Sequence, residues 1–194
     1  MKRLLLLRHA KSDWQDDSLA DHDRPLSARG QRASLSMSHF LASRWQPEAG
    51  ESAAPRSEDK LDATSALPWP DLVLCSTALR AEETLAPLLE HLKPKKIRVE
   101  REQGIYTFDY PPLLARIKAL PEAVTTVLMI GHNPAFERLA DRLAGPGTDS
   151  KSHGVMRRKY PTCALAELCL EGPWADLEPG GARLVAFTRP KDLM

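Results

Sequence analysis

Six short apolar segments predict buried β-strands. Leu4–Leu7 is an unbroken run of leucines after two basic residues, which is typical of a strand covered on both faces in a parallel sheet. Three longer segments carry apolar residues at helical spacing and lie between or after these strands. The other candidate strands are residues 71–76, 96–100, 125–131, 163–170 and 182–188, and the candidate helices are residues 27–45, 78–92 and 134–144.

This alternation predicts a three-layer α/β/α sandwich around a mostly parallel sheet. The two candidate strands of the last third are separated by a turn rich in Trp, Pro and Gly, and we expect an antiparallel strand at this edge. A length of 194 residues with 42% hydrophobic residues predicts one domain over residues 1–194. Residues 46–70 are rich in Pro, Ala, Ser, Glu and Asp and predict a flexible surface insertion, with a partner-binding arm as the alternative.

Charge, apolar stretch length and cysteine content predict the partners, the cellular location and the state of the thiols. A formal net charge of +1 provides no overall field for nucleic acid or an anionic membrane, so we expect neither as a partner. No apolar stretch approaches the roughly 20 residues of a membrane span, and four leucines are fewer than the roughly 7 to 15 apolar residues of a signal peptide. We therefore expect a cytoplasmic protein. Cys75, Cys163 and Cys169 lack metal-ligand spacing and lie in apolar runs, which predicts free, buried thiols.

Basic and imidazole side chains follow three of the candidate strands. Arg8 and His9 come directly after Leu4–Leu7, and His132 follows residues 125–131. Open parallel sheets hold their ligand sites outside the carboxyl ends of the strands. We therefore expect these side chains to meet in one crevice.

Two helix starts are expected at the same edge. Asn133 and Pro134 have the character of an N-cap and a first helical residue, and Thr77 can cap the helix whose first turn holds Arg80. Helix N-termini present free amides and partial positive charge to anions. Two guanidinium groups and such a helix end suit the oxygens of a phosphoryl group.

The combination favours phosphoryl transfer. Neighbouring guanidinium charges disfavour protonation of His9, so its imidazole would stay neutral and nucleophilic near neutral pH. A protonated His132 would donate to a phosphoryl oxygen and stabilise the developing charge. Taken alone, His9 could be structural and Arg80 could pair with Glu83 on a helix surface, but the set of four favours a catalytic site.

Other residues are expected around this site. Lys11, Ser12 and Asn133 are candidates for substrate binding, and Arg24, Ser27, Arg29 and Gly30 are expected to form a turn and helix start behind it. The basic run at residues 156–161 is either a rim that recognises an acidic protein or phosphate-bearing substrate, or a solvated face. The remaining histidines, expected to be structural or surface residues, are His22, His39, His91 and His153.

Four segments, LLRHAKS, DRPLSARG, STALRAEET and GHNP, occur in the order and approximate spacing of the histidine phosphatase superfamily, which this sequence resembles. The opening RHAKSDW, the GHNPAFERLA segment and the closing strands are most similar to the SixA-type branch of phosphohistidine phosphatases. The resemblance covers nearly the whole chain outside residues 46–70. It implies the phosphoglycerate mutase-like fold, phosphorylation and then hydrolysis of His9, and phosphoryl binding by Arg8, Arg80 and His132.

The sequence departs from the family pattern in two places. An Asn that many relatives carry shortly after the first histidine is missing, which leaves phosphate contacts from that loop open. Larger members carry a Glu that protonates an alkoxide leaving group, and Glu102 is the nearest candidate for a proton donor here. An imidazole leaving group, with a pKa of about 6.5, needs much less help from an acid than an alcohol does.

We therefore predict a metal-independent phosphatase that needs no cofactor and hydrolyses phosphohistidine on a phosphorylated protein. The alternative is a phosphomonoesterase for a small phosphorylated metabolite such as a sugar phosphate or nucleotide; a mutase would need an added segment to close over its site. A module that grips phosphorylated proteins without hydrolysis is a third reading, and the two histidines argue against it, since arginines and amides suffice to grip phosphate.

Overall fold

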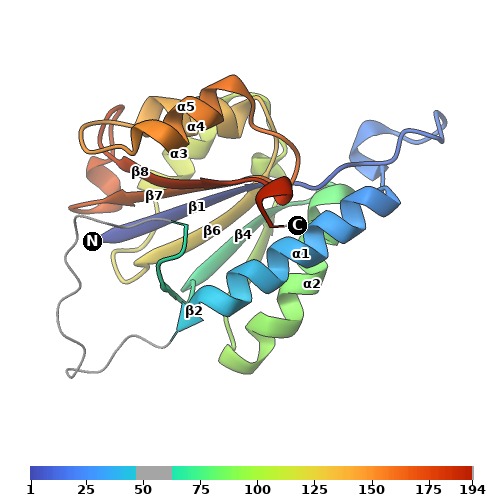
Figure 1. Ribbon diagram of the computed structural model, residues 1–194, viewed down its shortest axis with the longest axis horizontal. Helices are drawn as coiled ribbons and strands as arrows, with labels where there is room; N and C mark the ends of the chain where they lie inside the picture. Colours follow the sequence, from blue (N-terminus) through green and yellow to red (C-terminus); the bar gives the residue numbers. More distant parts are fainter. Residues whose placement is uncertain (47–62, 194) are drawn as a thin grey trace.

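The computed structural model describes residues 1–46 and 63–193, and its centre is a six-stranded sheet (Figure 1). β7 runs antiparallel to both of its neighbours, and every other pairing in the sheet is parallel. In spatial order the strands are β5 (Arg98–Glu102), β4 (Leu72–Ser76), β6 (Thr126–Gly131), β1 (Lys2–Arg8), β7 (Leu165–Leu170) and β8 (Arg183–Thr188).

Helices cover both faces of this sheet, which confirms the predicted α/β/α sandwich (Figure 1). On one face lie α1 (Ala28–Arg44) and α2 (Leu79–Leu92), and on the other lie α3 (Tyr110–Lys118), α4 (Ala135–Leu143) and α5 (Ser150–Arg158). Among the short 3-10 turns outside these elements, η1 (Asp21–Asp23) precedes α1, and η6 (Pro190–Asp192) follows β8.

The leucine run of β1 is buried on both sides, as its pattern predicts. Leu4 and Leu6 pack into the core beneath α3, α4 and α5, whereas Leu5 and Leu7 pack into the core beneath α1 and α2. Burial of one such side chain contributes about 1.5 to 3 kcal/mol. β1 therefore contributes to both cores, as the inner strands β4 and β6 also do.

The structure refines the expected elements at the sheet edges. The antiparallel strand β7 lies one position inside the edge, which β8 forms. β5 begins at Arg98 rather than residue 96, because Lys96 has a left-handed backbone with φ of 53°. α3 and α5 were not predicted from the sequence: prolines 111 and 112 mask the start of α3, and Met156 is the one fully buried residue of the short α5.

The segment predicted as a flexible insertion is ordered at its C-terminal end. Residues 47–62 lie outside the described residues, but β3 (Leu67–Pro68) pairs in parallel with β2 (Trp45–Gln46). Leu67 is buried, and the rings of Trp45 and Trp69 lie 5.1 Å apart. The prediction was thus wrong for residues 67–69, since two apolar side chains there complete the core beneath α1.

The three cysteines are free and buried, as predicted. Cys75 lies in β4 and Cys169 in β7, but Cys163 belongs to the turn before β7, where its φ is 59°. Burial raises the pKa of the Cys163 thiol to about 12. Within residues 1–46 and 63–193, none of the helices has the length and apolar character needed to cross a membrane.

Candidate active site

The expected side chains converge at the carboxyl ends of three neighbouring strands. β1 and β6 pair in register, with Arg8 opposite Gly131, so that the chain leaves both strands at the same level. The rings of His9 and His132 consequently lie 4.9 Å apart. α2 starts directly after β4 and brings the Arg80 Nη2 to 3.5 Å from the His132 Nδ1.

His9 is fixed in one tautomer by the backbone. Its ring is 8% exposed, and its Nδ1 lies 2.7 Å from the Ala10 carbonyl oxygen. A carbonyl only accepts, so Nδ1 carries the proton and Nε2 keeps its lone pair. Burial lowers the pKa of His9 to about 3, and the charges of Arg80 and Arg8 add to this effect. The imidazole is neutral as predicted, although burial contributes more to this than the guanidinium charges do.

His132 is also neutral, with the opposite tautomer. Its Nε2 lies 2.8 Å from the Ser76 Oγ, and its Nδ1 faces the guanidinium of Arg80, which can only donate. The proton is therefore on Nε2. Burial lowers the pKa of His132 to about 3, and the proximity of His9 and Arg80 adds to this effect. A protonated His132, as the sequence suggested, would require a phosphoryl dianion beside it to raise its pKa again.

Arg80 is 5% exposed and held by Asp21. Its Nη2 lies 2.8 Å from the Asp21 Oδ2, and its Nη1 donates to the Asp21 carbonyl. The Tyr106 hydroxyl donates to the same carboxylate at 2.7 Å, and its ring lies 5.2 Å from that of His132. Partial burial acts to raise the pKa of Asp21, but the hydrogen bonds from Tyr106 and Arg80 outweigh it and lower the pKa. Arg80 is thus a fixed cation in the site rather than a surface partner of Glu83.

The guanidinium of Arg8 has a buried N–H group, at Nε, without a hydrogen-bond partner among the described residues. Its Nη1 donates to the Tyr160 carbonyl at 2.6 Å. Burial lowers the pKa of this guanidinium. A buried donor of this kind is costly unless it is paired, so it suits an anionic ligand.

Neither predicted helix cap forms. Asn133 donates through its Nδ2 to Glu137 at 2.9 Å and to the Tyr160 carbonyl at 3.2 Å, and the N-cap of α4 is Pro134. Thr77 donates to the Gln103 Oε1 at 2.6 Å, and the N-cap of α2 is Ala78. Both side chains were predicted to turn toward their own helix, but each has a partner from another segment.

The remaining predicted site residues are exposed or have partners of their own. Lys11 is exposed, and the buried Ser12 hydroxyl accepts from the Trp14 Nε1 at 2.9 Å. Glu102 is held by Arg116, whose Nε and Nη2 lie 3.0 and 2.8 Å from its carboxylate oxygens. The carboxylate that contacts Arg80 is instead that of Asp21, which was not among the predicted site residues.

The turn at residues 24–30 lies behind the site, as expected. Ser27 caps α1 by accepting from the Gly30 amide at 3.2 Å. A β-carbon at Gly30 would lie 2.1 Å from the Lys11 carbonyl oxygen, so only glycine allows α1 to pack this closely on the loop after His9. His22, expected to be a structural or surface residue, bonds to Thr77 at 3.0 Å and lies edge-on to Tyr106.

Burial of two neutral histidines predicts acid sensitivity. Each has a pKa near 6.5 in the unfolded chain and about 3 in the fold, so the unfolded state binds more protons between these values. The free energy of unfolding should therefore be fully retained above pH 6.5 and fall as the pH drops, by up to about 1.4 kcal/mol per pH unit for each histidine. We expect His9→Ala to lose about 1 kcal/mol less than the wild type between pH 6 and pH 5.

Urea unfolding of the wild type and His9→Ala at each pH measures this difference. His39→Ala, which removes an exposed histidine, is the matched control and should follow the wild type. Parallel pH dependences for the wild type and His9→Ala would contradict the burial of a neutral His9.

Comparisons with known proteins agree in fold and sequence, although no family model matches the chain. An uncharacterized protein of Mycobacterium tuberculosis strain H37Rv is 37% identical over 186 residues, which cover 95% of this chain and 100% of the relative. A candidate phosphohistidine phosphatase SixA from Nakamurella multipartitia superposes with a TM-score of 0.74 at 26% identity, covering 97% of this chain and 96% of that one. A second candidate SixA, from Agrobacterium tumefaciens, gives a TM-score of 0.71 at 26% identity, covering 97% and 98%. This chain therefore belongs to the SixA-type branch of the histidine phosphatase superfamily and is a phosphatase.

Proposed function

We propose that this phosphatase hydrolyses phosphohistidine through a phospho-His9 intermediate and without a metal ion. The observation that carries the proposal concerns two carboxyl groups: Asp21, which contacts Arg80, and Glu102, the predicted proton donor. Asp21 is bound by Arg80 and Tyr106, with a lowered pKa, and Glu102 is bound by Arg116. Both carboxylates are thus paired with arginines, and Asp21, with its lowered pKa, has no proton to give near neutral pH.

The leaving group decides how much this matters. An alkoxide must gain a proton as it departs, whereas an imidazole leaves with a pKa of about 6.5. General acid catalysis contributes about 10²- to 10⁴-fold where it is needed. A site whose carboxylates are committed to arginines is therefore better suited to a phosphoramidate than to a sugar phosphate.

In the first proposed step, the lone pair of the His9 Nε2 attacks phosphorus, and the bond between phosphorus and the substrate nitrogen breaks. The electron pair of that bond stays on the substrate nitrogen, and the substrate ring, which carries a proton on its other nitrogen, leaves as neutral imidazole. Arg8 and Arg80 bind the equatorial oxygens, whose charge is spread in the transition state. The Nδ1–H bond to the Ala10 carbonyl holds the attacking ring in line.

In the second step, water attacks the phosphorus of phospho-His9, and the bond to Nε2 breaks. The His9 Nε2 regains its lone pair, and the proton of the water passes to the phosphate product. His132, beside the phosphoryl group, donates from Nε2 to one of its oxygens when a phosphoryl dianion has displaced Ser76 as its partner. The site returns to its starting state.

The proposal is tested by phosphate release from a phosphohistidine peptide and from a panel of sugar phosphates and nucleotides, each with and without a chelator. We expect chelator-resistant release with a strong preference for phosphohistidine. Faster release from the phosphoesters, lost selectively in Glu102→Gln, would establish the phosphomonoesterase instead. Loss of activity with the chelator would contradict metal independence, and phosphate binding without turnover would establish the binding module.

A further inference from the structure

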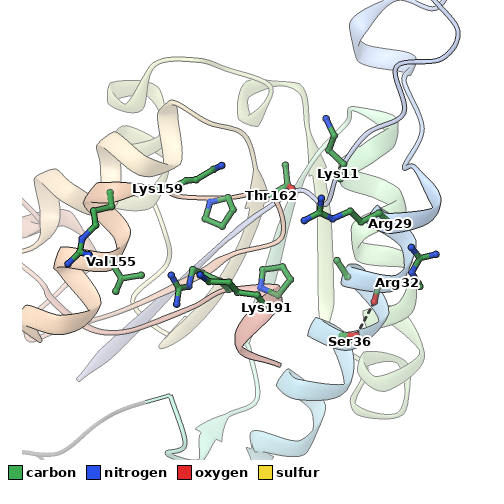
Figure 2. A pocket seen from close by; sticks show the side chains of 13 residues that line it. Lys11, Arg29, Arg32, Ser36, Val155, Lys159, Thr162 and Lys191 are labelled. Atoms are coloured by element: carbon green, nitrogen blue, oxygen red, sulfur yellow. Dashed lines mark hydrogen bonds between the residues drawn. The ribbon is translucent and has the colours of Figure 1, made fainter. Parts of the chain in front are cut away.

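A strongly basic cavity lies beside the two histidines. Its volume is about 690 Å³, and it is bounded by α1 on one side and by the C-terminal end of α5 on the other, with the η6 turn between them (Figure 2). We call it the basic cavity. Six exposed basic side chains line it: Lys11, Arg29, Arg32, Arg158, Lys159 and Lys191.

The charges of the basic cavity are not neutralised by the protein. Among the described residues, none of these six side chains forms a hydrogen bond or an ion pair, and no acidic residue lines the cavity. A seventh, Arg189, is paired with Asp192 at 2.8 Å. Like charges gathered in this way repel one another, and an anionic ligand would relieve the repulsion.

The basic cavity adjoins the catalytic residues through both of its walls. Lys11 follows His9 by two residues, and Lys159 and Pro161 flank Tyr160, whose carbonyl oxygen accepts from Arg8. The amide of Cys163, next to Thr162 of the same wall, donates to the His9 carbonyl at 3.0 Å. One ligand can therefore present a phosphoryl group to His9 and further anionic groups to the basic cavity.

Two features indicate that the anionic ligand of the basic cavity is a protein rather than a small polyanion. The six basic side chains are exposed and are not oriented by hydrogen bonds, which suits charge spread over a surface better than one compact anion. An exposed aromatic side chain, Phe108 at 61% exposure, also lies near the catalytic centre. Phe108 contacts Tyr106, which in turn contacts His132. Aromatic residues together with arginine are typical of protein interfaces.

We propose that the basic cavity docks an acidic segment of the phosphorylated protein from which His9 takes its phosphoryl group. This inference rests on the function proposed above, because it concerns the same phosphoprotein. The docked segment lies next to the phosphohistidine, and its carboxylates pair with arginines on α1 and α5. The ion pairs increase the affinity for the substrate and leave the chemical step unchanged.

The test uses three peptides with the same central phosphohistidine, flanked by glutamates, by serines or by lysines. For the wild type we expect the lowest KM with the glutamate peptide and the highest with the lysine peptide, at similar kcat. In the double variant Arg29→Glu/Arg32→Glu, the KM for the glutamate peptide should rise about tenfold. The KM values for the three peptides should then no longer follow the wild-type order. Raising the salt concentration should weaken the wild-type preference.

Arg142→Glu is the matched control. This exposed arginine lies in the last turn of α4, a helix that begins at the catalytic edge and ends at the opposite one. The preference of the Arg142→Glu variant among the three peptides should equal that of the wild type. Equal KM values for all three peptides, or an unchanged preference in the double variant, would overturn the docking proposal and leave the proposed function standing.

Binding measurements separate this proposal from the proposed function. If no peptide is hydrolysed, fluorescence anisotropy with the unphosphorylated glutamate peptide decides: binding that is lost in the double variant supports docking, and equal binding overturns it. Tight binding of inorganic tripolyphosphate by the wild type, without any preference among the peptides, would identify a small polyanion as the occupant and overturn the protein proposal.

Discussion

His9→Ala should show no measurable turnover of any phosphorylated substrate. The variant keeps the cationic groups that bind a phosphoryl group but has no nitrogen to accept it. His132 cannot replace it, because its Nε2 carries a proton that points to Ser76 and its Nδ1 faces Arg80. The rate of phosphate release under saturating substrate measures this loss.

The same variant tests the covalent intermediate directly. Wild-type protein quenched with denaturant during turnover should carry phosphate that is lost in acid and retained in base, as expected of a phosphoramidate, and His9→Ala should carry none. His39→Ala, at an exposed position, should be labelled like the wild type. Turnover with an unlabelled wild-type protein, or labelling that persists in His9→Ala, would sink the mechanism.

Arg80→Ala should lower kcat/KM by about 10²- to 10³-fold, the range found when one preorganised oxyanion donor is removed. Arg80 is buried and held by two bonds to Asp21, so its charge is in place before the substrate arrives. A lysine cannot supply the same planar fork, and we expect Arg80→Lys to recover only part of the rate.

Asp21→Asn distinguishes a direct contact of Arg80 with the phosphoryl group from an indirect effect of Arg80 on the Asp21 and Tyr106 pair. The asparagine keeps a carbonyl oxygen for Arg80 but removes the carboxylate charge, so a small loss is expected if Arg80 acts by contacting the phosphoryl group. A loss as large as that of Arg80→Ala would assign the effect to the order of the Asp21 and Tyr106 pair instead. An unchanged rate in Arg80→Ala would refute the proposed role.

The convergence of His9, His132 and Arg80 could be predicted because it follows from strand order. Parallel strands end at one edge of a sheet, and three apolar runs each deliver a chemically active side chain within a few residues of their end. Ser76, the partner of His132, also ends a strand, so the same rule could have found it.

The partners of the individual side chains could not be predicted in this way. Asn133 and Thr77 have good N-cap character, but each bonds to a residue that the fold brings near, Tyr160 in one case and Gln103 in the other. Asp21 and Tyr106 are distant in sequence, but the fold brings them into direct hydrogen bonding beside Arg80. A local pattern carries no information on such contacts, and α5 escaped prediction because only Met156 of its residues is fully buried.

The order of the strands has a consequence for synthesis on the ribosome. β1 is made first but lies between β6 and β7, which are more than a hundred residues downstream. At about 5 to 20 residues per second, its leucine run waits roughly 6 to 25 seconds for its nearest partner to be translated. During that interval the nascent chain exposes this leucine run without an edge to pair with, and such a segment is a natural site for chaperone binding.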